Sequence, residues 1–221
     1  MLNTNYILRI NPKTYSLGFL VVAVCLVSTH LALYLYNYQV EELEWLLLQL
    51  FDLDEENNLP TWFSSFLLLN NAFFLALVAR FPDAHDRLQW TLMSAGFFIL
   101  AIDEVAGLHE TFNSSIETNW AIFGAILVLV VGAAFIPFLL RLRRGLALMF
   151  IVSGVIFVSG AIIIELLSED MDSDSLAYMM AVSLEEGLEM LGAWLFLTTL
   201  LKEMSAGKDL NVGVAVGDFS D

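Results

Sequence analysis

Six long apolar stretches, separated by short polar segments, run through the chain. Each contains about 20 residues or more, which at 1.5 Å per helical residue crosses a hydrocarbon core roughly 30 Å thick. The pattern predicts an all-α fold: a polytopic membrane protein with a bundle of six transmembrane helices in one domain, residues 1–204. The predicted spans are 16–36, 60–81, 88–108, 120–142, 146–167 and 176–201.

Two further segments do not have the pattern of a span. In residues 41–53, leucines recur at helical spacing among acidic residues, which predicts a short amphipathic helix on the outer surface. Residues 205–221 are polar without periodicity, and we expect a poorly ordered tail. The first apolar stretch is longer than the apolar core of a typical signal peptide, so we expect it to be an uncleaved span.

The basic residues predict the orientation of the bundle. If the N-terminus lies inside, all nine basic residues fall on the inner side, and the three outer loops contain none and are acidic. This is the positive-inside pattern, and it places both termini in the cytoplasm. The nine are Arg9, Lys13, Arg80, Arg87, Arg141, Arg143, Arg144, Lys202 and Lys208.

Composition supports the membrane class and excludes other classes. The chain is 58% hydrophobic with a mean hydropathy of +0.74, more apolar than a typical soluble domain. A net charge of −16 excludes a nucleic-acid partner and gives no support to a basic lipid-docking patch. Cys25 is the single cysteine, so no internal disulfide forms. We expect a multi-pass protein of a cell membrane, with the bacterial inner membrane as our working assignment.

Acidic residues inside the apolar stretches mark the candidate site, because a charge within a bilayer is costly and is usually kept for function. In the predicted topology these residues lie near mid-membrane or toward the outer side. Glu185 and Glu189 are four apart and share a helix face. Glu104 and His109 point to different sides unless Gly107 ends the helix. The candidate cation or metal ligands are Asp103, Glu104, His109, Glu110, Glu165, Glu185, Glu186 and Glu189, with His30, Asn70 and Asn71 in supporting positions.

The predicted spans contain no lysine or arginine that could pair with these acids, apart from residues at their ends. Unpaired buried carboxylates take up protons, bind a cation or stand in water. Carboxylates with an imidazole suit Mg, Mn, Fe or Zn, and carboxylates alone suit Ca or Mg. A divalent metal ion is therefore the one cofactor that we expect, with its identity open. For His30, Asn70 and Asn71, hydrogen bonds between helices are the simpler interpretation.

Histidine is too scarce for several metalloenzyme classes. Three histidines in the whole chain disfavour a histidine-rich di-iron oxidase and a three-histidine zinc hydrolase. Helical di-iron carboxylate sites use Glu-x-x-His pairs, whereas Ala106 stands three residues before His109. The sequence also lacks a phosphate-binding loop, a G-x-S-x-G turn and an H-E-x-x-H stretch.

A short similarity between the two halves of the chain bears on function. Asp103-Glu104 and Glu185-Glu186 occupy the third predicted helix of each half, and these helices run in opposite directions, as in an inverted 3+3 repeat. We therefore favour a cation- or proton-coupled transporter. The alternatives are a metal-dependent membrane enzyme acting on a lipid or quinone-like substrate, and a non-catalytic accessory membrane subunit. The expected partners are the lipid bilayer, a cation or proton, and a membrane protein or second copy of the chain.

Overall fold

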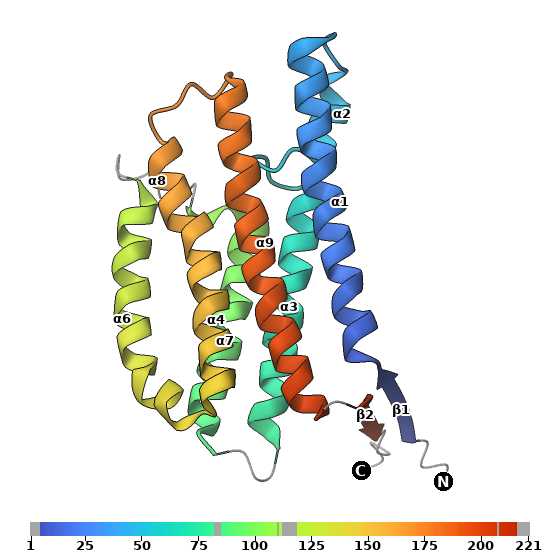
Figure 1. The fold of residues 1–221 in the computed structure, drawn as a ribbon, viewed down its shortest axis with the longest axis vertical. Coiled ribbons are helices and arrows are strands. Elements are labelled where there is room, and N and C mark those ends of the chain that lie inside the picture. Colours follow the sequence, from blue (N-terminus) through green and yellow to red (C-terminus); the bar gives the residue numbers. More distant parts are fainter. Residues whose placement is uncertain (1–4, 82–84, 110, 112–118, 207, 216–221) are drawn as a thin grey trace, which may run out of the picture.

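The structure, a computed structural model, is a bundle of long helices with one small sheet at its end (Figure 1). It describes residues 5–81, 85–109, 111, 119–206 and 208–215. The prediction of an all-α fold is confirmed for the bundle. The helices are α1 Pro12–Gln39, α2 Trp45–Phe51, α3 Leu59–Arg80, α4 Arg87–Ala106, α6 Trp120–Arg141, α7 Arg144–Val158, the π-helix η1 Ser159–Ile164, α8 Glu165–Ser168 and α9 Leu176–Ser205; the strands are β1 Asn5–Ile10 and β2 Leu210–Ala215.

Among the described residues, five helical segments are long and apolar enough to cross a membrane: α1, α3, α4, α6 and the continuous segment Arg144–Ser168 formed by α7, η1 and α8. The sixth predicted span corresponds to α9, which has 30 residues. Glu185, Glu186 and Glu189 interrupt its apolar sequence, so the crossing of α9 remains a prediction.

Side-chain caps define where several helices begin. Asn11, Asn58 and Asn119 each accept a hydrogen bond from a backbone N–H in the first turn of α1, α3 and α6. Ser175 does the same at the start of α9. Prolines follow the caps of α1 and α3, where a missing N–H costs nothing.

Helix α9 lies at the centre of the bundle and packs against α1, α3 and α7, while α3 packs along α4 (Figure 1). Its approach to α7 depends on small residues. A Cβ at Gly192 would lie 2.6 Å from the backbone nitrogen of Phe157. The core below the middle of the bundle includes Phe74, Phe196 and Leu197, all buried.

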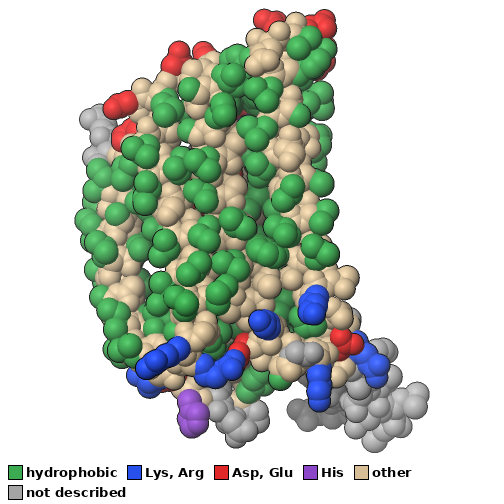
Figure 2. Space-filling model, viewed as in Figure 1, with side chains coloured by type: hydrophobic (Ala, Val, Ile, Leu, Met, Phe, Trp, Pro, Cys, Tyr) green, Lys and Arg blue, Asp and Glu red, His purple; other side chains and the backbone are tan. Residues whose placement is uncertain are grey.

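Charge divides the two ends of the bundle. The lysines and arginines flank helix ends that meet at the end carrying both termini, and acidic side chains gather at the opposite end (Figure 2). Apolar side chains cover the surface between the two ends.

The tail differs from our expectation for residues 205–221, since part of it is ordered. Strand β2 pairs antiparallel with β1, and Leu210 lies opposite Ile10. Both side chains are buried against the end of the core. The pairing needs a partner at least 200 residues away in sequence, which local periodicity does not reveal.

The packing of the two halves is not equivalent. Helix α1 packs along α9, whereas α6, its counterpart in an inverted repeat, makes no comparable contact with α4 among the described residues. Helix α6 instead lies beside α7 and η1 at the edge of the bundle. The repeat therefore gains no support from the helix packing.

Candidate functional site

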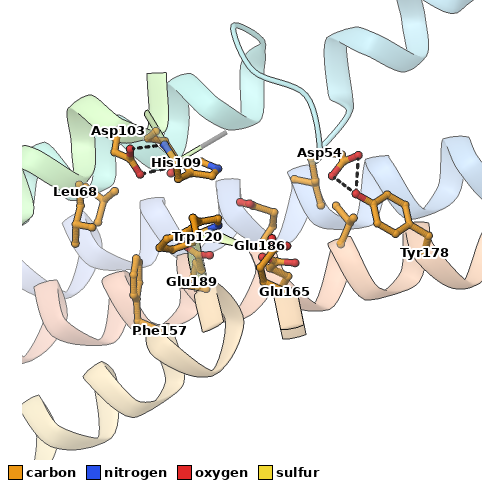
Figure 3. A pocket seen from close by; sticks show the side chains of 16 residues that line it. Asp54, Leu68, Asp103, His109, Trp120, Phe157, Glu165, Tyr178, Glu186 and Glu189 are labelled. Atoms are coloured by element: carbon orange, nitrogen blue, oxygen red, sulfur yellow. Dashed lines mark hydrogen bonds and ion pairs between the residues drawn. The ribbon is translucent and has the colours of Figure 1, made fainter. Parts of the chain in front are cut away.

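One cavity of about 250 Å³ brings together most of the predicted site residues (Figure 3). Its walls come from α3, α4, η1, α8, α9 and the loop between α2 and α3. Seven carboxylate side chains line it: Asp54, Asp103, Glu104, Glu165, Glu185, Glu186 and Glu189. His109 and Trp120 complete its polar and aromatic wall.

Helix α9 supplies the largest share of the acidic wall. Tyr178, Val182, Glu185, Glu186 and Glu189 all line the cavity. Their spacing of three and four residues places them on one helix face, with Glu186 beside Glu185. Sequence reasoning missed Tyr178, although it stands seven residues before Glu185 on this face.

The end of α4 positions His109. Gly107 adopts φ +53° and ends the helix at Ala106, which is a left-handed conformation that glycine adopts readily. The chain turns back, so the backbone N–H of His109 donates to Asp103 Oδ1 at 3.2 Å. The Nδ1 atom of His109 lies 3.1 Å from Asp103 Oδ2. Asp103 thereby fixes both the backbone and the ring of His109.

Two neighbouring side chains, Glu56 and Ser64, lie close to the end of α4. A Cβ at position 107 would lie 2.4 Å from the carboxylate of Glu56, so the end of this flexible side chain would have to shift for any larger residue. The side chain of Ser64, on α3, is buried and lies beside the carboxylate of Glu104. Neither Glu56 nor Ser64 was predicted, because no spacing rule connects the α2–α3 segment with α4.

A π-helix directs Glu165 to the cavity. Segment η1 replaces the α-helical pattern just before Glu165, and π-helical turns of this kind are frequent at functional sites. Gly160 within η1 lies against α9, where an added Cβ would come 2.5 Å from the carbonyl oxygen of Glu185. The Asn119 side chain donates to Glu165 Oε1 at 3.2 Å. The acids of α8 and α9 are therefore held close together.

The mouth of the cavity involves a residue that the sequence analysis did not select. Asp54, in the α2–α3 loop, is exposed and lines the cavity. The hydroxyl of Tyr178 donates to its carboxylate, 2.9 Å from Oδ1 and 3.1 Å from Oδ2. In sequence Asp54 is one of several loop acids, and only its contact with α9 distinguishes it.

The three residues predicted in supporting positions do not line this cavity. His30 is fully buried, and its Nδ1 accepts a hydrogen bond from the backbone N–H of Leu53 at 3.1 Å. It therefore anchors the loop that carries Asp54. Asn70 accepts a hydrogen bond from the Tyr15 hydroxyl, and Asn71 donates to the carbonyl of Ala193 at 3.0 Å. The two asparagines connect α3 to α1 and to α9.

The ionisable side chains that line the cavity are mostly acidic. Among the described residues that line it, none is a lysine or an arginine. Glu186 and Glu189 make no hydrogen bond or ion pair to any part of the chain that the structure describes. Glu110, also predicted as a ligand, lies outside the described residues.

The arrangement does not form a ready metal site. In the described ranges, no group of three His, Cys, Asp or Glu side chains is placed to hold a metal ion. The carboxylates instead surround the cavity from several elements. Metal binding at these residues therefore remains a prediction.

Comparison with protein-family models gives one match, covering residues 17–203, to a domain of unknown function, DUF8692. The chain belongs to this family. The DUF8692 match includes every described residue that lines the cavity, from Leu53 to Glu189. Comparisons with curated proteins and with solved structures found no match. The DUF8692 family carries no described activity, so function is inferred from the cavity itself.

Proposed function

We propose that this protein is a cation- or proton-coupled membrane transporter whose substrate site is the carboxylate cavity. One observation carries the proposal: seven carboxylates from four segments line one cavity, and no lysine or arginine is among its described lining residues. Carboxylates in such a place are stable only when protonated, hydrated or neutralised by a cation. Protons and cations can therefore compete for the same groups.

The placement of α9 supports a sixth crossing of the membrane. It packs against three of the helical segments that are apolar enough to span: α1, α3 and the segment Arg144–Ser168 (Figure 1). Glu185, Glu186 and Glu189 face the cavity instead of the lipid, which is the usual position of ionisable residues within a span. With the basic end in the cytoplasm, the cavity lies toward the outer side.

The packing below the cavity supports a state with access from one side. Phe196 of α9 stacks on Phe150 of α7 with ring centroids 4.4 Å apart, and Leu197 and Leu200 are almost completely buried. This core separates the cavity from the basic end. In a transport cycle, α9 would have to move against α3 and α7 to open the cytoplasmic side.

A flux assay tests transport directly. The full chain is reconstituted in liposomes containing a pH-sensitive dye, and gradients of Na⁺, K⁺, Ca²⁺, Mn²⁺ or methylammonium are imposed. We expect at least one cation to drive proton movement with wild type, and the double variant Glu185→Gln/Glu189→Gln to lose it. Glu169→Gln, a matched change of an exposed acid outside the cavity, should keep it. Absence of flux with every cation in the wild type would contradict transport.

A metal-dependent enzyme acting on a lipid or quinone-like substrate is the second candidate. The observation that favours it is the His109–Asp103 pair, since metal-binding histidines commonly have a carboxylate on their other ring nitrogen. Elemental analysis of purified protein separates the two candidates. Stoichiometric metal that is retained in wild type and lost in Glu186→Gln favours the enzyme. Absence of retained metal favours transport, because a transport site must release its ion.

A further inference from the structure

A second, apolar cavity of about 280 Å³ lies on the flank of the bundle and is lined by residues of α4, α6, α7 and α9. We call it the lateral crevice. Helices α4 and α6 meet at its inner end, where the rings of Trp90 and Phe138 are 4.9 Å apart. Beyond the outer end of α4, His109 and Trp120 are in ring contact at 5.3 Å. Between these two contacts the helices separate.

The lateral crevice adjoins the carboxylate cavity at a single shared residue. Leu100 lines both of them. From Leu92 to Leu100 the crevice follows α4 for about 12 Å, at 1.5 Å per residue. Its other lining residues are apolar or glycine, such as Met93, Gly96 and Phe135. The apolar crevice and the acidic cavity therefore both border Leu100.

We propose that the substrate is an amphiphilic organic cation, a long-chain ammonium compound whose chain lies in the lateral crevice and whose head group enters the carboxylate cavity. This inference rests on the proposed cation site and names its substrate class. Charge complementarity selects the head group, because seven carboxylates and no described lysine or arginine line the cavity. The crevice selects the chain, since its walls offer apolar contact alone.

The form of the acidic wall also suits an ammonium group. A metal ion needs several ligands at about 2.0–2.6 Å around one point, and the described residues provide no such group. An ammonium head donates up to three hydrogen bonds in separate directions. Glu186 and Glu189, which have no hydrogen-bond partner in the described chain, are available as acceptors.

Gly96 provides a direct way to close the crevice. A Cβ at this position meets no atom within 4 Å, so a side chain added here begins in open space. Glycine to leucine or alanine within a helix also favours helix formation. Gly96→Leu should therefore fill the crevice in a folded protein, and Gly96→Ala is the matched control.

Photo-crosslinking of the full chain in phosphatidylcholine vesicles tests the proposal. The probes are a dodecylamine with a diazirine in its chain and the corresponding alcohol, and labelled peptides are identified by mass spectrometry. We expect the amine to label segments 92–100 and 131–139 about tenfold more than the alcohol, equal to roughly 1.4 kcal/mol of head-group preference. Gly96→Leu and Glu185→Gln/Glu189→Gln should each abolish this difference, and Gly96→Ala should keep it.

Two outcomes would overturn the inference. Equal labelling by amine and alcohol would mean that ordinary lipid chains fill the crevice. Undiminished amine labelling in Gly96→Leu would mean that the chain lies elsewhere. Methylammonium binding to the same variants separates this failure from failure of the cation site. If methylammonium binds but the amine probe does not label the crevice, the cation site is supported and the inferred substrate class is wrong. If Glu185→Gln/Glu189→Gln changes neither methylammonium binding nor amine labelling, the cation site and the inferred substrate class are both wrong.

Discussion

The hydroxyl of Tyr178 donates to both carboxylate oxygens of Asp54, joining α9 to the loop between α2 and α3 at the mouth of the carboxylate cavity. These residues are 124 positions apart in sequence. The contact connects the helix that carries three of the glutamates with the loop that covers them.

Tyr178→Phe should weaken the contact between α9 and the α2–α3 loop. It removes the hydroxyl donor, and a hydrogen bond to a charged group contributes about 1.5–3 kcal/mol when well shielded, less at an exposed site. We expect a lower melting temperature in detergent and a loss of about 1 kcal/mol. Tyr36→Phe is the control, because Tyr36 is exposed and its hydroxyl has no hydrogen bond within the described chain. Equal melting of the two variants would contradict a role for the Tyr178–Asp54 contact.

Replacement of Gly160 should separate η1 from α9. In Gly160→Ala the new Cβ would lie 2.5 Å from the carbonyl oxygen of Glu185, and overpacking of this kind costs about 1–3 kcal/mol. Gly154→Ala, one helix segment earlier, meets no atom within 4 Å and should be neutral or slightly stabilising. Thermal unfolding of both variants checks this. A Gly160→Ala protein as stable as Gly154→Ala would show that η1 and α9 are not in close contact.

His30 should matter through its acceptor atom and not through charge. Its Nδ1 accepts from the backbone N–H of Leu53, so this nitrogen carries no proton. His30→Leu fills the space and leaves a buried donor unpaired, at a cost of about 1–3 kcal/mol. His30→Asn can keep an acceptor near the same place and should lose less. The comparison uses chemical denaturation in detergent, and equal losses would contradict the anchoring role.

Much of the fold follows from the sequence because membrane-length apolar stretches with polar ends encode their own helices. The predicted span 120–142 and the observed α6 differ by one residue, and the acids of α9 were placed on one face from spacing alone. Gly107 was recognised as a possible end of the helix, which would change where His109 points, and α4 ends there.

Other features depend on contacts that sequence spacing does not encode. Asp54 belongs to the cavity only because Tyr178 lies opposite it. The pairing of Ile10 with Leu210 joins two distant segments that each lack enough pattern to predict a strand. The π-helix η1 contains Gly160, which packs closely against α9, and composition gives no sign of this segment.

The orientation can be tested independently of function. The nine basic residues predict that residue 221 and the turn at Arg141–Gly145 are cytoplasmic. Fusions of a phosphatase active only outside and a fluorescent protein active only inside should report cytoplasmic positions at both sites. A fusion at residue 116 provides the opposite control. Phosphatase activity at residue 221 would show that an odd number of helices crosses the membrane or that the bundle is inverted.

The central claim is that carboxylates from separate elements form one cation-binding cavity. Calorimetric titration of Mn²⁺ and of methylammonium into purified protein, beside Glu185→Gln/Glu189→Gln and the control Glu169→Gln, tests it most directly. We predict saturable binding of at least one probe, weakened about tenfold or more in the double variant, which is roughly 1.4 kcal/mol, and unchanged in Glu169→Gln. Equal binding by all three proteins, or none by the wild type, would contradict the claim.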